Sequence, residues 1–353
     1  MSISIEYEKV ILAREFNRLT QKELVEELKL YNAIISQGEI SKIELGQRKE
    51  ISEGLLNAIS LALKFPIDFF LTPTNKKNIK GGLYRKKQSL SKKDQDYIEA
   101  NINIFKDIYF DLLDFVEIIS VDIPYYTTYT DSPKLIAQKL RKYWDVEGVL
   151  DNLVDLLENN GIVVSYIDIK DDKFDGFSCF LDKNYFIFIN SRLPGDRLRF
   201  TIAHELGHII MRHDDTLNPL SDEEANQFAS EFLIPESEAY MDLLNLTCEK
   251  AYYLKGKWKV SMAALIKKAF DTNIITSSRY KSLMVQMSKL GYRKIEPNPI
   301  PKEKPTLFKE IIDVYMKKRQ YETLDDVARA VNVGTDVLKK YFYTPNVSNI
   351  RLV

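Results

Sequence analysis

The sequence predicts an α+β fold that is mostly helical, with helical regions at both ends and one small β-sheet between them. Helix caps and apolar residues at helical spacing recur along most of the 353 residues. Compact β-branched and aromatic runs occur between about residues 162 and 189. Basic or proline-rich stretches separate the parts. We therefore expect four segments: 1–73, 74–130, 131–296 and 297–353.

The composition is that of an ordinary folded protein. Hydrophobic residues make up 45% and charged residues 29% of the chain, which excludes disorder as a class. A formal net charge of −1 gives no overall attraction to nucleic acid or to an anionic membrane. Two cysteines, Cys179 and Cys248, make neither a disulfide framework nor a cysteine-type zinc site. Because no apolar signal core or membrane-spanning run is present, we expect a cytoplasmic protein with no membrane partner.

The N-terminal segment, residues 7–71, predicts short helices separated by turns. Thr20 is placed to cap one helix, and a second helix starts at Ser36. Residues 76–93 then contain eight lysines and arginines and no acid. This stretch predicts a linker or a basic arm. Helical periodicity resumes over about 94–119.

The middle of the chain contains the predicted sheet. A helical region over 133–160 stops at Asn159-Asn160-Gly161. Helices resume at about residue 196, run through the histidines, and continue over 221–233 and on to Leu290. A proline-rich linker over 297–305 precedes a final helical piece that ends near Tyr341. The strands are Ile162–Ile167, Gly176–Leu181 and Tyr185–Ile189, the last two flanking a hairpin turn at Asp182-Lys183-Asn184.

The three histidines of the chain all lie between residues 204 and 213. His204 and His208 are four residues apart, so a helix places both imidazoles on one face. Two imidazoles so placed can hold one Zn²⁺ and leave positions for a third ligand and water. Glu205 is placed to act as general base on that water, whose pKa zinc lowers toward ~7. The alternative, a surface helix that happens to carry these residues, fits poorly with its nearly apolar surroundings.

The third ligand is open to several candidates. His213 would be the ligand in an H-E-x-x-H-x-x-G-x-x-H pattern. However, Met211 stands where that pattern has glycine, and the histidine falls one residue short. We therefore reject His213 as a ligand.

Acidic residues at the start of the next helix are the better candidates. Asp222 extends the inward stripe of that helix at spacings of three and seven residues. Glu223 points away from the stripe and Glu224 lies at its edge. Asp222 is therefore the first choice, with Glu223 and Glu224 as alternatives. The stripe consists of Ala225, Ala229 and Phe232.

The stretch from Arg199 to His208, followed by Glu224 to Pro235, resembles the ImmA/IrrE metallopeptidase family. The resemblance extends over roughly residues 130–300 and implies a zincin-like fold. It implies that the acid three residues before the alanine of Ala-Asn is the third zinc ligand. That acid is usually glutamate and is Asp222 here. It also implies that the substrate is a protein, with transcriptional repressors of mobile elements or stress regulons as the expected class.

The strand Tyr185–Ile189 is placed to pair with an extended substrate by edge addition. A plain core strand is the alternative.

Residues 36–46, with Leu19 to Leu24 upstream, resemble an XRE (Cro/C1-type) helix-turn-helix. Such a unit places its second helix in the major groove of DNA. By this resemblance Gln21 would hold a phosphate, and Ile40 and Ile43 would be core. Residues 1–71 carry 11 acids and 9 bases. We therefore expect the 76–93 arm to supply phosphate contacts, or else to be a solvated linker. The residues expected to face the DNA are Gln37, Gly38, Glu39, Ser41 and Lys42.

Together these patterns predict a DNA-binding regulator with a zinc endopeptidase domain. The alternative is a non-catalytic XRE transcription factor, antitoxin-like or ligand-sensing, that uses a metallopeptidase fold. The expected partners are operator DNA and a repressor substrate. The C-terminal residues 323–341 have a helix-turn-helix rhythm, which predicts a packing or dimerisation element and allows for a homodimer.

Overall fold

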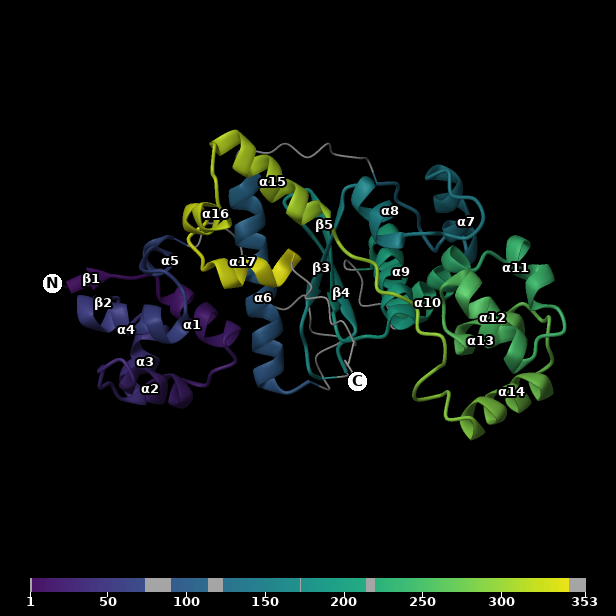
Figure 1. Cartoon of the computed structure of the whole chain (residues 1–353), viewed down its shortest axis with the longest axis horizontal. Coiled ribbons are helices and arrows are strands. Elements are labelled where there is room, and N and C mark those ends of the chain that lie inside the picture. The colour runs from purple at the N-terminus through teal and green to yellow at the C-terminus, as the bar shows by residue number, and fades with distance from the viewer. Residues whose placement is uncertain (1, 74–89, 114–122, 172, 214–219, 343–353) are drawn as a thin grey trace, which may run out of the picture. The chain divides into compact units, whose positions relative to one another are not determined.

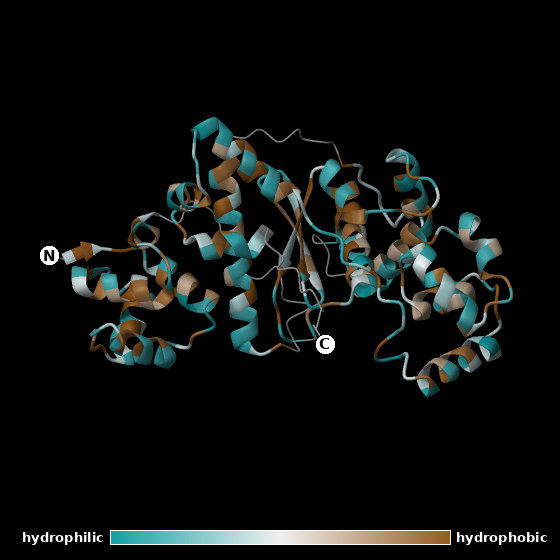
Figure 2. Cartoon of the chain, in the orientation of Figure 1, coloured by the Kyte–Doolittle hydropathy of each residue, from teal (hydrophilic) through white to brown (hydrophobic). Residues whose placement is uncertain are grey.

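A computed structural model describes residues 2–73, 90–113, 123–171, 173–213 and 220–342 (Figure 1). Most of the basic arm expected from the sequence lies outside these described residues. The structure is mostly helical, as the sequence predicts, and it contains two small sheets where the sequence predicted one. Teal and brown alternate around most of the helices in Figure 2, as expected for helices with one buried face. No described helix is both long and apolar enough to cross a membrane.

The chain divides into two compact units, which are described separately. The first unit combines Met1–Ile118, Ile169–Phe174 and Thr306–Val353. The four segments expected from the sequence stay a prediction. The helices of the first unit are α1 (Tyr7–Phe16), α2 (Gln21–Lys29), α3 (Gln37–Glu44), α4 (Glu53–Leu63), α5 (Ile67–Leu71), α6 (Lys92–Leu113), α15 (Leu307–Arg319), α16 (Leu324–Ala330) and α17 (Thr335–Phe342).

The first unit also contains a two-stranded sheet, so its N-terminal part is not all-α as the sequence suggested. Strand β1 (Ser2–Ser4) pairs antiparallel with β2 (Glu50–Ser52). Ile51 on β2 is buried, with 1% of its surface exposed. Each strand has only three residues, too few to show a period of two in the sequence.

The C-terminal helices pack against α6. The Phe105 ring lies 4.8 Å from that of Phe308 and 5.1 Å from that of Tyr341, measured between ring centroids. The Tyr341 hydroxyl donates a hydrogen bond to the carbonyl oxygen of Asn101 at 3.0 Å. These contacts support the packing role expected for residues 323–341. The expected role in dimerisation stays a prediction.

The second unit combines Ile119–Asp168 and Asp175–Pro305. Its core joins the sheet to the helices on either side of it in sequence. Its helices are α7 (Pro133–Tyr143), α8 (Leu153–Asn159), α9 (Gly195–Met211), α10 (Ser221–Leu233), α11 (Glu236–Leu243), α12 (Cys248–Trp258), α13 (Met262–Asp271) and α14 (Ser277–Lys289). Its strands are β3 (Ile162–Ile167), β4 (Gly176–Leu181) and β5 (Asn184–Asn190).

The three strands of the second unit are ordered β3-β5-β4. Strand β5 pairs parallel with β3 and antiparallel with β4. The expectation that 185–189 offers an open edge to a substrate is therefore wrong, because β5 is the central strand. The alternative of a core strand is correct. Within the described residues, the edge beside α9 is β4, which α9 contacts directly.

The proline-rich stretch before residue 305 is part of the second unit and packs against it. The Glu303 carboxylate accepts hydrogen bonds from the backbone amides of Leu153 and Val154 at 2.8 and 2.9 Å, which caps the start of α8. It also forms an ion pair with Arg199 of α9, whose side chain is 2% exposed. This stretch is therefore a strap fastened to α8 and α9 and does not behave as a free linker.

Candidate metal centre

Helix α9 carries the three residues of the H-E-x-x-H motif. It ends at Met211, and the next residue, Arg212, adopts a left-handed backbone conformation with φ of 50°. His204 and His208 lie one turn apart on α9, and their Nε2 atoms are 3.0 Å from each other. Both side chains are largely buried, with 13% and 15% of their surface exposed. The spacing of four residues therefore brings both imidazoles to one point, as the sequence predicts.

Helix α10 brings a carboxylate to the same point. An oxygen of Asp222 lies 3.8 Å from Nε2 of His204 and 3.4 Å from Nε2 of His208. Tetrahedral ligands at ~2.0–2.1 Å from one zinc ion are separated by roughly 3.3 Å. The observed separations of 3.0, 3.4 and 3.8 Å bracket that value. The residues present therefore fit a tetrahedral metal site with three protein ligands.

The other candidates for the third ligand lie elsewhere. Among the described residues, only His204, His208 and Asp222 form a group suited to holding a metal ion. Glu223 is exposed. The carboxylate of Glu224 lies 3.1 Å from Nε2 of His213. The geometry thus favours Asp222 over Glu223 and Glu224.

Gly207 explains how α10 approaches so closely. A Cβ atom at Gly207 would lie 3.0 Å from Cδ1 of Phe228 and 3.3 Å from Cα of Ala225. Both distances are shorter than ordinary van der Waals contact. Glycine inside a helix costs stability relative to alanine, and here it allows the two helices to pack close together. The residues of the expected inward stripe, Ala225, Ala229 and Phe232, are all fully buried.

Each metal-facing histidine is held at its other ring nitrogen. Nδ1 of His204 lies 2.9 Å from the amide oxygen of Asn226 on α10. Nδ1 of His208 lies 3.0 Å from Nδ1 of His213. Such contacts fix the orientation and the tautomer of metal-binding histidines. The sequence reasoning did not assign these roles to Asn226 or His213. Asn226 could have been found, since it lies four residues after Asp222 on the same helix face.

Glu205 points to the sheet side of the site. Its side chain accepts a hydrogen bond from the hydroxyl of Ser178 on β4 at 2.8 Å, and only 1% of the residue is exposed. Ser178 was missed because the contact joins residues 27 positions apart, and no local pattern reports it. A carboxylate so placed is oriented next to the two histidines.

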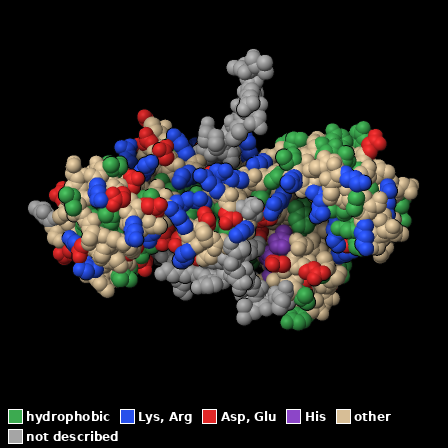
Figure 3. Space-filling view, turned by 90° about the horizontal axis from the view of Figure 1, so that it is seen from below, with side chains coloured by type: hydrophobic (Ala, Val, Ile, Leu, Met, Phe, Trp, Pro, Cys, Tyr) green, Lys and Arg blue, Asp and Glu red, His purple; other side chains and the backbone are tan. Residues whose placement is uncertain are grey.

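A cavity of about 190 Å³ opens beside His208. Arg212 stands at this cavity with its guanidinium 4.4 Å above the ring of Tyr125. In Figure 3 histidine side chains reach the surface next to a group of acidic side chains. The described part of the site thus opens to the surface. The cavity is lined by Ser178, Cys179, Phe180, Tyr185, His208, Ile209 and Arg212.

Residues 157–270 match the model of the peptidase M78 family, the IrrE N-terminal-like domain. The matched segment includes α9 and α10, so this part of the chain is a metallopeptidase-like domain, and that family suggests a metal cofactor. The match begins at residue 157 and does not bear on the N-terminal region. No curated protein matches the chain.

The residues expected to contact DNA lie on the first unit. Ser36 and Thr20 cap their helices as predicted, accepting hydrogen bonds from the backbone amides of Glu39 and Glu23. Ile40 and Ile43 are fully buried, as expected. The expected DNA-facing residues divide by exposure: Gln37, Gly38 and Lys42 are exposed, whereas Gln21, Glu39 and Ser41 are half-buried.

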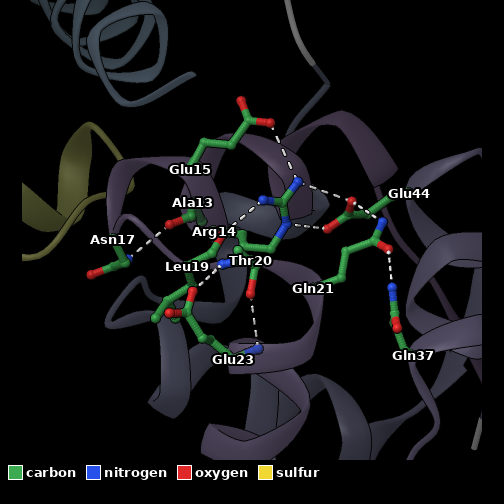
Figure 4. Close-up of polar contacts among 10 residues, drawn as sticks. All are labelled: Ala13, Arg14, Glu15, Asn17, Leu19, Thr20, Gln21, Glu23, Gln37 and Glu44. Carbon is green, nitrogen blue, oxygen red and sulfur yellow. Dashed lines mark hydrogen bonds and ion pairs between the residues drawn. The ribbon is translucent and has the colours of Figure 1, made fainter. Parts of the chain in front are cut away.

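A polar network inside the first unit connects α1, α2 and α3 (Figure 4). Nε of Arg14 donates to Glu44 at 2.6 Å, and Gln21 donates to the same carboxylate at 2.8 Å. The amide of Gln37 donates to Gln21 at 3.5 Å. Gln21 is the residue expected to hold a phosphate. Its side-chain amide instead donates to Glu44 and accepts a hydrogen bond from Gln37. The sequence reasoning missed Arg14 and Glu44.

Glu39 is also engaged within the unit. Its carboxylate pairs with Lys42 at 2.8 Å and with Arg48 at 2.7 Å. These two cations hold the pKa of Glu39 below its usual value. Each carboxylate oxygen of Glu39 therefore already accepts one hydrogen bond from within the unit.

Proposed function

We propose that this chain is a zinc-dependent endopeptidase. The observation that carries the proposal is the convergence of His204, His208 and Asp222, whose ligand atoms all lie within 4.8 Å of one another. These residues would hold the zinc ion through Nε2, Nε2 and a carboxylate oxygen. The match of residues 157–270 to a peptidase family supports the same activity.

The bound zinc would supply a Lewis acid that polarises the substrate carbonyl and makes water acidic enough to react at neutral pH. Glu205 takes the proton from the attacking water at its carboxylate and passes it to the nitrogen of the leaving amine. The Ser178 hydroxyl holds that carboxylate in place. Asn226 and His213 hold the two imidazole rings.

The strand β4 supports an extended peptide as the substrate. Among the described residues it is the sheet edge beside α9, and its Ser178, Cys179 and Phe180 line the cavity next to His208. A peptide added to this edge would pair with the backbone of β4. A cavity of about 190 Å³ has room for an apolar substrate side chain, since an engineered cavity of roughly 150 Å³ binds benzene.

We propose a transcriptional repressor of a mobile element or of a stress regulon as the substrate protein. The resemblance of residues 130–300 to ImmA/IrrE peptidases supports this class. The helix-turn-helix resemblance of residues 19–46 links the chain to the same regulatory setting.

We further propose that the first unit binds DNA through α3. The arrangement that supports this is the exposed start of α3, where Gln37 and Gly38 follow the capping Ser36. Backbone amides at a helix start attract phosphate, and an exposed glutamine can pair with adenine. The Arg14–Glu44–Gln21 network fixes α2 and α3 relative to each other, which a reading helix needs.

The peptidase activity is tested on peptides derived from a denatured proteome. The zinc-loaded chain should generate new N-termini, identified by mass spectrometry, at a set of related sites. Glu205→Gln should bind zinc normally and slow this cleavage by roughly 10²–10⁴-fold, because the proton acceptor is lost. Cleavage at the wild-type rate by Glu205→Gln would rule out Glu205 as the base.

DNA binding is tested with a pool of random-sequence duplexes in a fluorescence anisotropy titration. The affinity should fall as salt rises, because phosphate contacts release counterions. Gln37→Ala combined with Lys42→Ala should weaken binding, whereas Lys29→Ala at the far end of α2 should not. Equal loss in both variants would remove α3 as the contact surface.

A non-catalytic regulator with the same fold is the second candidate. The exposure of Asp222 favours it, because 71% of that side chain is open to solvent. An aspartate also has one methylene less than the glutamate usual in the resembled family. Zinc analysis of the purified chain separates the candidates. A chain that holds no zinc after reconstitution would be the regulator.

A further inference from the structure

A buried histidine and glutamate lie behind the candidate metal centre and take no part in the ligand set. His213 is 7% exposed, and its Nδ1 lies 3.0 Å from Nδ1 of His208. On its other side, Nε2 of His213 lies 3.1 Å from a carboxylate oxygen of Glu224. The side chain of Glu224 is 19% exposed. A continuous row thus runs from the Glu224 carboxylate through His213 to His208.

When a metal occupies Nε2 of His208, the chemistry of these atoms allows one consistent placement of protons. A metal-binding His208 must offer a bare Nε2, so its proton sits on Nδ1. The Nδ1–H of His208 can then be donated to Nδ1 of His213 only if that nitrogen is unprotonated. His213 then carries its own proton on Nε2, which faces a carboxylate oxygen of Glu224 at 3.1 Å. The opposite direction would put a proton on Nε2 of His208, where a metal would bind.

We propose that His213 and Glu224 are positioning residues that hold His208 in the tautomer able to bind metal. This inference rests on the proposed function, since it concerns the zinc ligand His208. It assigns to His213 the role that Asn226 has toward His204, whose Nδ1 faces an amide oxygen at 2.9 Å. The first part of α10 therefore supplies three residues of the centre. Asp222 is the candidate ligand, Asn226 contacts the ring of His204, and Glu224 contacts the ring of His213.

The tautomer can be measured without metal. The chain has three histidines, so ¹⁵N-histidine labelling gives three ring systems, which long-range nitrogen–proton spectra at pH 8 can assign. Wild-type His208 should carry its proton on Nδ1. In His213→Leu the Nδ1 acceptor is gone and the proton should move to Nε2. A wild-type His208 protonated on Nε2, or no change in His213→Leu, would overturn the proposal.

Zinc affinity gives a second readout, measured by competition with a chromophoric chelator. His213→Leu should weaken binding by roughly 10–100-fold, the usual effect of losing such a support. His213→Asn places an amide oxygen near the former Nδ1 and should recover most of the affinity. Glu224→Gln should weaken binding, whereas Glu223→Gln, an exposed neighbour on the same turn, is the matched control.

The outcomes separate the two proposals. A wild-type chain that fails to bind zinc would refute the proposed function and leave the tautomer test intact. Normal zinc binding in the wild type with equal affinity in His213→Leu would refute the positioning role alone. Melting of the metal-free variants identifies any that fail to fold. In that case His213→Asn, which keeps a polar group of similar size, decides between the outcomes.

Discussion

At the residue scale, the candidate centre depends on an aspartate where the resembled family usually has glutamate. The shorter side chain still reaches the two histidines, with carboxylate-to-Nε2 distances of 3.4 and 3.8 Å. It does so because α10 packs tightly on α9 at Gly207. The shorter ligand and the close helix packing are therefore two parts of one arrangement.

Removing the charge of Asp222 tests this ligand directly. Loss of a residue that only contacts a zinc ligand typically lowers zinc affinity by roughly 10–100-fold. We expect Asp222→Asn to lower the affinity by more than this, because a ligand itself is lost. Chelator competition measures the change. If Asp222→Asn binds zinc as tightly as wild type while Glu223→Gln does not, the third ligand has been assigned to the wrong acid.

Glu15 of α1 gives a pH-dependent prediction for the first unit. Burial, together with the nearby Asp96, raises the pKa of Glu15 from its usual 4.5 to about 7. A raised folded-state pKa contributes stability that is complete below pH 4.5 and is lost as the pH rises through 7.

Glu15→Gln removes the stability loss at high pH, because glutamine does not ionise. We expect the variant and the wild type to be equally stable near pH 4.5, where the glutamate is protonated. At pH 8 the variant should be more stable by up to about 3 kcal/mol, since one pKa unit corresponds to ~1.4 kcal/mol. Urea unfolding followed at both pH values measures this. A constant difference between the two proteins across the range would contradict the shifted pKa.

At the element scale, the packing of α10 on α9 and the strap over α8 shape the second unit. The sequence located α9 and α10 well, because the apolar spacing of their residues is a local signal. It missed the hydrogen bond from Ser178 to Glu205 and the role of the strap. Both depend on contacts between residues far apart in sequence, which no local period reports.

Gly207→Ala tests the packing of the two helices. Alanine improves helix propensity by up to about 1 kcal/mol, but its Cβ would press on Phe228 and on the backbone at Ala225. We expect a net loss of roughly 1–3 kcal/mol in unfolding free energy, as for other overpacked cores. Zinc affinity should fall too, since α10 carries Asp222.

Gly54→Ala on α4 is the matched control. Nothing lies within 4 Å of a Cβ built there. This variant should gain stability from propensity alone, by up to about 1 kcal/mol. Equal stabilisation by both substitutions would show that α10 does not need the glycine.

Glu303→Gln tests the strap. The substitution leaves the buried Arg199 guanidinium without its carboxylate and weakens the cap on α8. Breaking a buried ion pair from one side typically costs roughly 3–5 kcal/mol. We expect a loss of that order in urea unfolding of the second unit, while Glu147→Gln, an exposed acid in the same unit, changes little. Equal stability of the two variants would show that the strap does not stabilise the second unit through Glu303.

At the scale of the whole molecule, the sequence predicted the mostly helical α+β class and the three strands of the second unit. The helices were predictable from caps such as Thr20 and Ser36. The strands were predictable from β-branched runs such as Ile162–Ile167. The order of the strands was not predictable, so the sequence left 185–189 open between a substrate-binding edge and a core strand, and it is the central strand. Strand order depends on which segments meet in space, and the hairpin turn fixes only one of the two pairings.

The central claim is that a single chain holds one zinc ion through His204, His208 and Asp222. The most direct measurement is zinc content by elemental analysis after reconstitution and exhaustive dialysis of the full chain, alongside His204→Ala and His208→Ala. We predict one zinc ion per wild-type chain and almost none in either variant, with all three proteins folded. A folded wild-type chain without zinc, or full zinc retention in His204→Ala, would contradict the account.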